Sequence, residues 1–129
     1  MGTIQPSTFS YNIVIMAKDL KKEINQLHAH VCSGLADPNR ILILYTLAEA
    51  PSNVSDLAES LETPQPTVSR HLKVLKDRGM VSSERQGQSV IYRVADNRII
   101  KALDILREVL RDTLESQVSL ALSVGDELE

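Results

Sequence analysis

The stretch TPQPTVSRHLKVLKDRG, residues 63–79, carries the pattern that decides the fold. Thr63 and Pro64 suit the start of a helix, because threonine can cap the first turn and a proline there loses no hydrogen bond. The inward stripe of this helix consists of Val68, Leu72 and Leu75, and the outward side of Pro66, Thr67, Arg70 and Lys73. The segment therefore predicts an amphipathic helix with a basic outer face.

The composition predicts one small, mostly helical domain. The chain has 129 residues, of which 43% are hydrophobic, and it contains one Phe and no Trp. This length suits a single core. Aliphatic side chains in so short a chain are typical of packed helices.

The cysteine content and the amino-terminal sequence indicate the cellular compartment of the protein. The single cysteine, Cys32, cannot form an internal disulfide, so a secreted disulfide scaffold is not indicated. The first twenty residues lack the pattern of a signal peptide, and residues 13–17 are too short an apolar run to span a bilayer. We therefore expect a cytoplasmic protein.

Charge is unevenly distributed along the chain. Residues 64–98 carry seven Lys and Arg against three Asp and Glu, whereas the remainder carries seven against fourteen. A basic segment between acidic flanks lets one surface attract polyanions while the rest stays soluble. The net charge of −3 therefore does not exclude a nucleic-acid partner.

Three further helices are predicted before the opening stretch. Apolar residues at three- and four-residue spacing indicate an amphipathic helix over residues 18–35. Asp37 and Pro38 suit the cap and first turn of the next helix, and residues 54–61 fit a short third helix. A break of only a few residues before the basic helix predicts a helix-turn-helix.

A β-hairpin is predicted directly after the basic helix. Gly79 suits a left-handed helix end, and residues 80–94 alternate as two strands about Gln86 and Gly87. Val90, Tyr92 and Val94 share one strand face, and the polar tip is expected to carry Arg85, Gln88 and Arg93. A helix-turn-helix followed by a hairpin is a winged helix, mostly α with a small β-hairpin.

The outer face of the basic helix fits the major groove of DNA. Arg70 can pair with guanine and Gln65 with an adenine edge, while Lys73, Lys76 and Arg78 can meet phosphates. The alternative is a solvated helix face with ordinary surface charge. His71 borders the buried stripe, and we expect it to be packed and hydrogen-bonded rather than in contact with a base.

The last helix predicts self-association. Residues 97–122 place Ile99, Leu103, Leu106, Leu110 and Leu114 on one stripe, more than one small domain can cover. Burial against a second copy through the first and last helices suits a protein that binds two-fold DNA; the alternative is an intramolecular core stripe. The expected organisation is an arm over residues 1–15, a DNA-binding and dimerisation domain over 16–122, and an acidic tail over 123–129.

Three motifs resemble the ArsR/SmtB family of bacterial winged-helix repressors: LADPNRILIL (35–44), DLAESLETPQPTVSRHLKVLKDRGMV (56–81) and RQGQSVIYRV (85–94). The resemblance covers about residues 27–110, although PTVSRHL alone is also similar to the MarR family. It implies a homodimeric repressor that leaves its double-stranded operator, an inverted repeat, when an inducer binds. It also implies DNA contacts at Gln65, Thr67, Ser69, Arg70, Lys73, Arg85 and Gln88.

One departure from the family pattern lies in the turn. Members usually have glycine in the turn and serine before the glutamine, where this chain has Glu62 and Pro64. The departure affects the angle at which the basic helix begins and one expected phosphate contact.

The inducer is left unassigned by the motifs. The family's Cys-Val-Cys site would lie in NVSDLAESL, which has no cysteine, and its second site needs histidines that residues 97–122 lack. His28 and Cys32 share a helical face, but two ligands do not complete a tetrahedral site. Metal binding, thiol oxidation and an ordinary structural role remain alternatives for this pair, and no cofactor is predicted.

Catalysis is not indicated. The chain has no glycine-rich phosphate loop, no Ser/His/Asp set and no paired carboxylates in a pocket-forming context. The alternative to a DNA-binding regulator is a protein-interaction module built on the same winged helix, without operator-specific DNA binding. Because phosphate neutralisation releases counterions, salt dependence of duplex binding separates the two.

Overall fold

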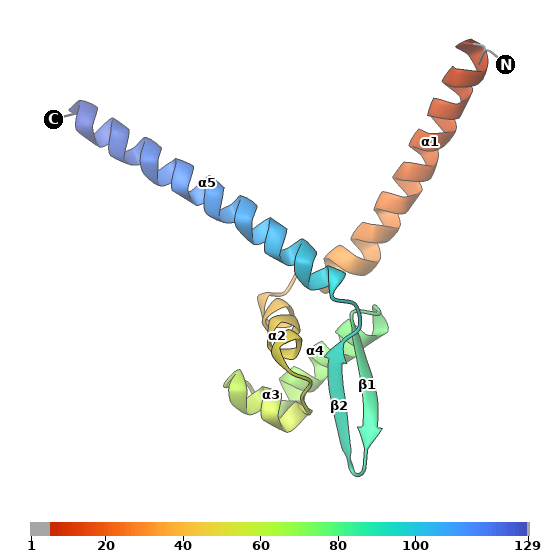
Figure 1. Cartoon of the computed structure of the whole chain (residues 1–129), viewed down its shortest axis with the longest axis vertical. Helices are drawn as coiled ribbons and strands as arrows, with labels where there is room; N and C mark the ends of the chain where they lie inside the picture. Colours follow the sequence, from red (N-terminus) through yellow and green to blue (C-terminus); the bar gives the residue numbers. More distant parts are fainter. Residues whose placement is uncertain (1–5, 129) are drawn as a thin grey trace.

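The computed structural model describes residues 6–128, with the side chains of residues 16–125. It is mostly helical with one antiparallel hairpin, the arrangement of a winged helix-turn-helix (Figure 1). The predicted fold class is thus confirmed. In chain order the elements are α1 (Pro6–Leu27), the π-helical turn η1 (His28–Cys32), α2 (Pro38–Glu49), α3 (Val54–Ser60), α4 (Gln65–Asp77), β1 (Val81–Gln86), β2 (Ser89–Val94) and α5 (Arg98–Leu128).

The core lies between α2, α3, α4, the base of the hairpin and the first turns of α5. Its central side chains are aliphatic and at most 2% exposed: Ile43, Leu44, Leu47, Leu57, Val68, Leu72, Leu75, Met80 and Val81. The stripe predicted for α4 is therefore buried, which fixes the opposite face of this helix toward solvent.

Two helix ends shape the helix-turn-helix. Asp37 caps α2 as predicted, because its Oδ1 accepts a hydrogen bond from the Asn39 amide at 2.8 Å. After α3, the amide of Thr63 bonds to the Ala58 carbonyl and that of Glu62 to the Glu59 carbonyl, a Schellman ending. Glu62 has a φ of +50°, a conformation that glycine adopts without strain.

The predicted cap of α4 is wrong. The N-cap residue is Pro64, with no side-chain cap, and α4 begins at Gln65 with Pro66 in its first turn. The Thr63 hydroxyl instead donates to the Leu61 carbonyl at 3.0 Å. The Schellman ending of α3 extends through Thr63, so this residue lies one position too early to cap the next helix.

The hairpin turns one residue later than predicted. Gln86 pairs with Ser89, so Gly87 and Gln88 form the turn. Gly87 has a φ of +64°, as the first position of a tight hairpin turn requires. At the base of the hairpin, Ser52 and Tyr92 exchange backbone hydrogen bonds of 3.1 and 2.8 Å, which fastens β2 to the loop after α2.

The first and last helices are longer than predicted. The helix α1 begins at Pro6, whereas residues 1–15 were expected to form an arm, and residues 1–5 lie outside the described part. Proline is compatible with a first helical turn. The helix α5 continues to Leu128 through the expected tail, because Gly125 weakens a helix without ending it. The helix expected over residues 18–35 is interrupted by η1.

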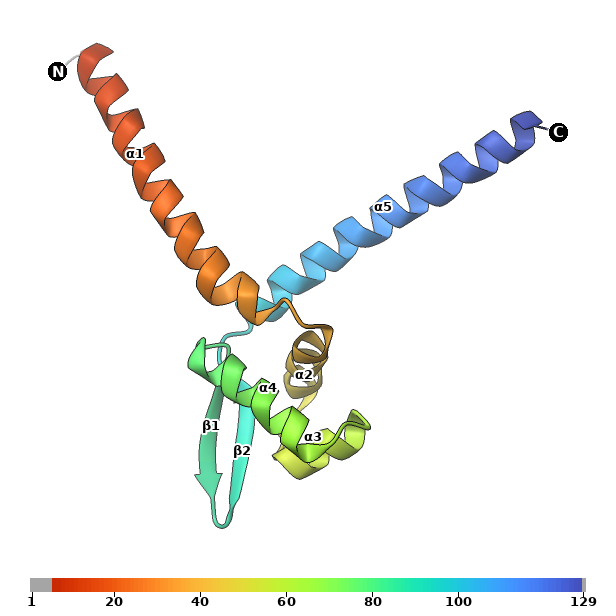
Figure 2. The same ribbon diagram turned by 180° about the vertical axis from the view of Figure 1, so that it is seen from behind.

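The helices α1 and α5 leave the core at the same end and diverge, while the hairpin points the other way (Figures 1 and 2). No helix in residues 6–128 is both long and apolar enough to cross a membrane. The fold thus presents two separate surfaces, one on α4 and the hairpin and one on the diverging helices.

Candidate nucleic-acid interface

The outward face of α4 gathers five of the seven predicted contact residues. Burial of Val68, Leu72 and Leu75 on the other side of the helix sets this orientation. Thr67 is half-buried, and the other four side chains are exposed: Gln65, Ser69, Arg70 and Lys73. The helix therefore offers hydroxyl, amide and cationic groups to solvent along one face.

Two side-chain contacts organise the amino-terminal half of this face. The Arg70 Nη2 donates to the Thr67 Oγ1 at 3.4 Å, and the Gln65 Nε2 donates to the Ser55 Oγ of α3 at 3.3 Å. Ser55 is exposed and was not among the predicted residues. The available signal was its place in the first turn of α3, two residues after the capping Asn53.

The α4 face is electropositive. Arg70, Lys73 and Lys76 are exposed, and within residues 16–125 none of them forms an ion pair. Cations that form no ion pair remain available to a polyanion. The face therefore matches the charge of a phosphate backbone.

The hairpin lies beside α4 and adds a second basic element (Figure 2). Arg85 and Gln88 are exposed, Gln88 in the turn itself. Arg93, which was expected at the tip, pairs with Ser82 next to the base of the hairpin, and its guanidinium contacts the Glu84 carboxylate at 3.4 Å. The tip is thus left with Arg85 and Gln88.

Arg78 does not belong to the electropositive face. It was predicted to meet phosphate, yet it is half-buried and donates to the carbonyls of Ala29 and His30 at 2.7 and 2.9 Å and to the Ser33 hydroxyl. Arg78 is the C-cap residue of α4, where the chain turns back toward the end of α1. The prediction is wrong because position along the helix, rather than residue type, decides where this side chain points.

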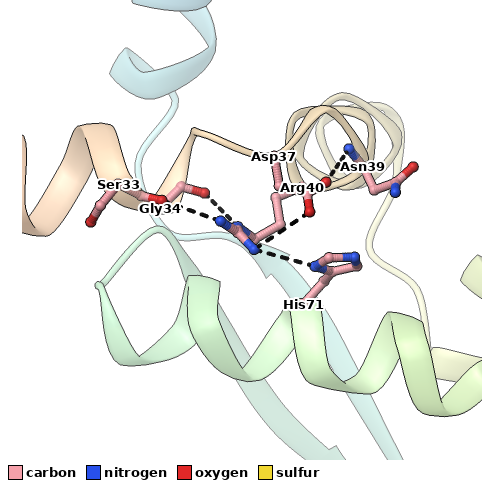
Figure 3. A network of polar contacts seen from close by, with 6 residues as sticks. All are labelled: Ser33, Gly34, Asp37, Asn39, Arg40 and His71. Carbon is pink, nitrogen blue, oxygen red and sulfur yellow. Dashed lines mark hydrogen bonds and ion pairs between the residues drawn. The ribbon is translucent and has the colours of Figure 1, made fainter.

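His71 is packed and hydrogen-bonded, as predicted. It is half-buried, and its Nδ1 lies 3.5 Å from the Nη1 of Arg40 on α2 (Figure 3). A guanidinium only donates, so Nδ1 is the acceptor in this contact. The ring therefore connects α4 to α2.

The candidate sensing residues lie around η1. His28, His30 and Cys32 are exposed. Within the described ranges, no group of three or more His, Cys, Asp or Glu residues is placed to hold a metal ion. Among the residues that the structure describes, none thus completes a metal site with His28 and Cys32.

A long apolar surface covers the diverging helices. Leu20, Ile24 and Leu27 of α1 are about half exposed, at 54, 50 and 49%. On α5, Leu103 is buried in the core, but the stripe beyond it is 50 to 61% exposed at Leu106, Val109, Leu110 and Leu114. Exposed apolar surface of this extent marks an interaction site.

Polar contacts fix the base of α5 to the core. The Tyr45 hydroxyl donates to the Asp104 carboxylate at 2.6 Å, and the Arg107 guanidinium lies 5.0 Å from the Tyr45 ring centroid. Partial desolvation, and then this hydrogen bond, raise the pKa of Tyr45. At the start of α5, side-chain and backbone hydrogen bonds from Arg98 lower the pKa of Asp96 to about 2.

The sequence is similar to known transcription regulators. The family model described as "Bacterial regulatory protein, arsR family" matches residues 37–83. The HTH-type transcriptional repressor SmtB of Mycobacterium tuberculosis is 42% identical over 78 residues, which are 60% of this chain and 58% of that protein. The HTH-type transcriptional regulator MJ1325 of Methanocaldococcus jannaschii is 34% identical over 82 residues, 63% of this chain and 92% of that protein.

The fold is also similar to solved structures. The homodimeric winged helix-turn-helix DNA-binding domain of Mb0332 from Mycobacterium bovis superposes with a TM-score of 0.64 at 27% identity, covering 71% of this chain and 85% of that one. The family-model match covers α2, α3, α4 and the first residues of β1. This chain spans a little under three fifths of the length of the SmtB repressors.

Proposed function

Because the chain belongs to the ArsR family of bacterial regulatory proteins, we propose that it is a transcriptional repressor that binds an inverted-repeat operator as a homodimer. One observation carries this proposal: the electropositive face of α4 lies on a winged helix-turn-helix and has no acidic partner among residues 16–125. An inducer releases the repressor from its operator.

The α4 face reads the major groove in this proposal. Arg70 pairs with the O6 and N7 of guanine, and Gln65 with the N6 and N7 of adenine. Thr67 and Ser69 make shorter hydroxyl contacts, and Lys73 and Lys76 neutralise phosphates. The buried stripe on the opposite side supports this assignment, because it holds the helix rigidly while its outer face docks.

The wing contacts the adjacent DNA backbone. Arg85 and Gln88 are exposed near the turn, on the hairpin that lies beside α4. Arg93 and Glu84 form an ion pair on the strands beneath them. Phosphate contacts of this kind set the register of the protein on the duplex, while α4 supplies the sequence preference.

Dimerisation through α1 and α5 supplies the second α4 helix, which binds the other half of the operator. Their apolar stripes are exposed in the single chain, and burying one such leucine contributes about 1.5–3 kcal/mol. The similar domain from M. bovis is described as homodimeric. Two copies related by a two-fold axis match the symmetry of an inverted repeat.

Duplex titration at several salt concentrations tests the proposal. Fluorescence anisotropy of a labelled inverted-repeat duplex, selected by the protein from a random-sequence pool, should show affinity that falls steeply as salt rises. Replacing Lys73 with alanine should lower the slope of log affinity against log salt by about one. Lys101→Ala on α5 is the matched control, since it removes the same charge from a different surface.

Two results would count against a DNA-binding role. Failure to enrich any duplex at low salt, or affinity that does not vary with salt, would favour the protein-interaction module. Equal slopes for the Lys73→Ala and wild-type proteins would remove Lys73 from the interface.

A further inference from the structure

The end of α1 is unusual in its backbone hydrogen bonds. In η1 the Ser33 amide bonds to the His28 carbonyl, five residues back, in place of the usual four. The carbonyls near the end of this helical segment lie at the negative end of its dipole. Cationic donors are therefore favoured at this end.

Arg78 supplies one such donor from the end of α4. Its Nη1 contacts three acceptors: the Ala29 carbonyl at 2.7 Å, the His30 carbonyl at 2.9 Å and the Ser33 hydroxyl. Nη1 carries two hydrogens, so the three acceptors share them, and the planar guanidinium fixes the direction from which this nitrogen approaches. Arg78 thus joins the carboxyl end of α4 directly to η1 and Ser33, which continue α1.

Arg40 supplies the second donor from the first turn of α2. Its Nε donates to the Gly34 carbonyl at 2.6 Å and its Nη2 to the Ser33 carbonyl at 3.2 Å, while Nη1 faces His71 Nδ1 at 3.5 Å (Figure 3). The Asp37 carboxylate lies 3.9 Å from the same guanidinium. One side chain therefore connects the end of α1, the start of α2 and the middle of α4.

Close packing completes the junction. Gly34 is buried, and a Cβ atom at this position would collide with the Met80 methyl group and the Arg78 Cδ. The two arginines therefore act at a site where the end of α1 already lies directly against the residues that follow α4. Beyond this junction α1 projects away from the core (Figure 1).

We propose that Arg40 and Arg78 are positioning residues that hold α4 at a fixed angle to α1 and thereby set the half-site spacing that the dimer accepts. The inference rests on the proposed function, because it assumes that α1 packs against a second copy and α4 reads DNA. One extra base pair moves a half-site by about 3.4 Å along the duplex and rotates it by roughly 35°. A rigid junction resists that displacement, and a loosened one accommodates it.

The test measures spacing selectivity. The probe is the selected inverted-repeat duplex, together with versions in which one base pair is added or removed between the half-sites. We expect the wild-type protein to lose about tenfold or more in affinity for the altered spacings. The Arg40→Lys/Arg78→Lys double variant keeps both positive charges but not the guanidinium hydrogen bonds. Its affinity for the duplexes of altered spacing should fall by less than about threefold.

The control variant is Arg111→Lys on α5, which makes the same chemical change at an exposed arginine that forms no hydrogen bond within residues 16–125. It should retain wild-type selectivity. Circular dichroism and sedimentation must show each variant folded and dimeric. Arg40→Lys and Arg78→Lys alone provide folded alternatives if the double variant fails to fold.

The outcomes distinguish failure of the positioning role from failure of the proposed function. If the wild-type protein binds a selected operator and the folded arginine variants keep its full spacing selectivity, the positioning role is overturned and the proposed function stands. If wild-type binding is absent or independent of salt, the proposed function itself fails. A lower melting temperature with unchanged selectivity also overturns the proposal, because it indicates structural support alone.

Discussion

The helices α4 and α5 carry the same type of apolar stripe, but they differ in what covers it. Val68, Leu72 and Leu75 of α4 are fully buried by the chain's own α2, α3 and hairpin. On α5 the stripe is buried only at Leu103, and Leu110 is 55% exposed. Three- and four-residue spacing therefore identifies an apolar face, and the surrounding topology decides whether that face forms core or interface.

The largest effect should come from shortening a side chain of the buried apolar stripe on α4. Leu72→Ala should lower the free energy of unfolding by about 2–5 kcal/mol, because it removes buried methyl groups and leaves a cavity. Leu114→Ala on α5 is the matched change on the uncovered stripe. Urea unfolding at several protein concentrations should show a loss for Leu72→Ala at every concentration, and for Leu114→Ala only where dimer is present. Equal, concentration-independent losses would remove the distinction between the two stripes.

A charge on the uncovered stripe should separate the copies without unfolding the chain. Leu110→Asp places a carboxylate in the proposed dimer interface and should cost about 2–3 kcal/mol of association or more. Sedimentation should then show monomer with unchanged helix content. A variant that remains dimeric would place the second copy elsewhere.

Substitutions on the outer face of α4 should weaken DNA binding without disturbing the apolar stripe of α4 or that of α5. Arg70→Ala should cost about 1–3 kcal/mol of operator binding and relax preference at one position, whereas Lys76→Ala should weaken all duplexes alike. Anisotropy titrations on single-position variants of the selected duplex provide the measurement. A uniform loss for Arg70→Ala would reassign this residue to a phosphate.

The two Schellman endings that flank α4 offer a smaller, paired comparison. Gly79 has a φ of +72°, and a Cβ there would meet open space, so Gly79→Ala should cost about 1–2 kcal/mol through backbone strain alone. Glu62 already bears that strain at +50°. Glu62→Gly should therefore be neutral or stabilise by up to about 1 kcal/mol. Thermal unfolding measures both, and a clear loss for Glu62→Gly would contradict the strain argument.

The smallest effect is expected at Cys32. It is exposed on η1, and no third ligand approaches it within the described ranges. Cys32→Ser should therefore leave operator release unchanged when zinc, arsenite or an oxidant is added to the complex. Altered release with any of the three would assign sensing to this residue.

Local patterns predicted most of the elements. The Asp37 cap of α2 and the left-handed Gly79 depend on interactions within about one helical turn, and the apolar stripe of α4 follows from three- and four-residue spacing. His71 was also placed correctly, because its angle on α4 puts it beside that stripe. The cap of α4 was misplaced because the ending of α3 overlaps it at Thr63.

Residue patterns alone predicted a winged helix-turn-helix, the outward basic face of α4 and a surplus of apolar surface on the first and last helices. The folded chain was needed to show that Arg78 faces the carbonyls of Ala29 and His30, 49 and 48 residues away, and that Arg40 reaches His71 across 31 residues. Periodicity reports which side of a helix is apolar over a few turns. The partner of a charged side chain depends on how separate helices meet, which no local pattern encodes.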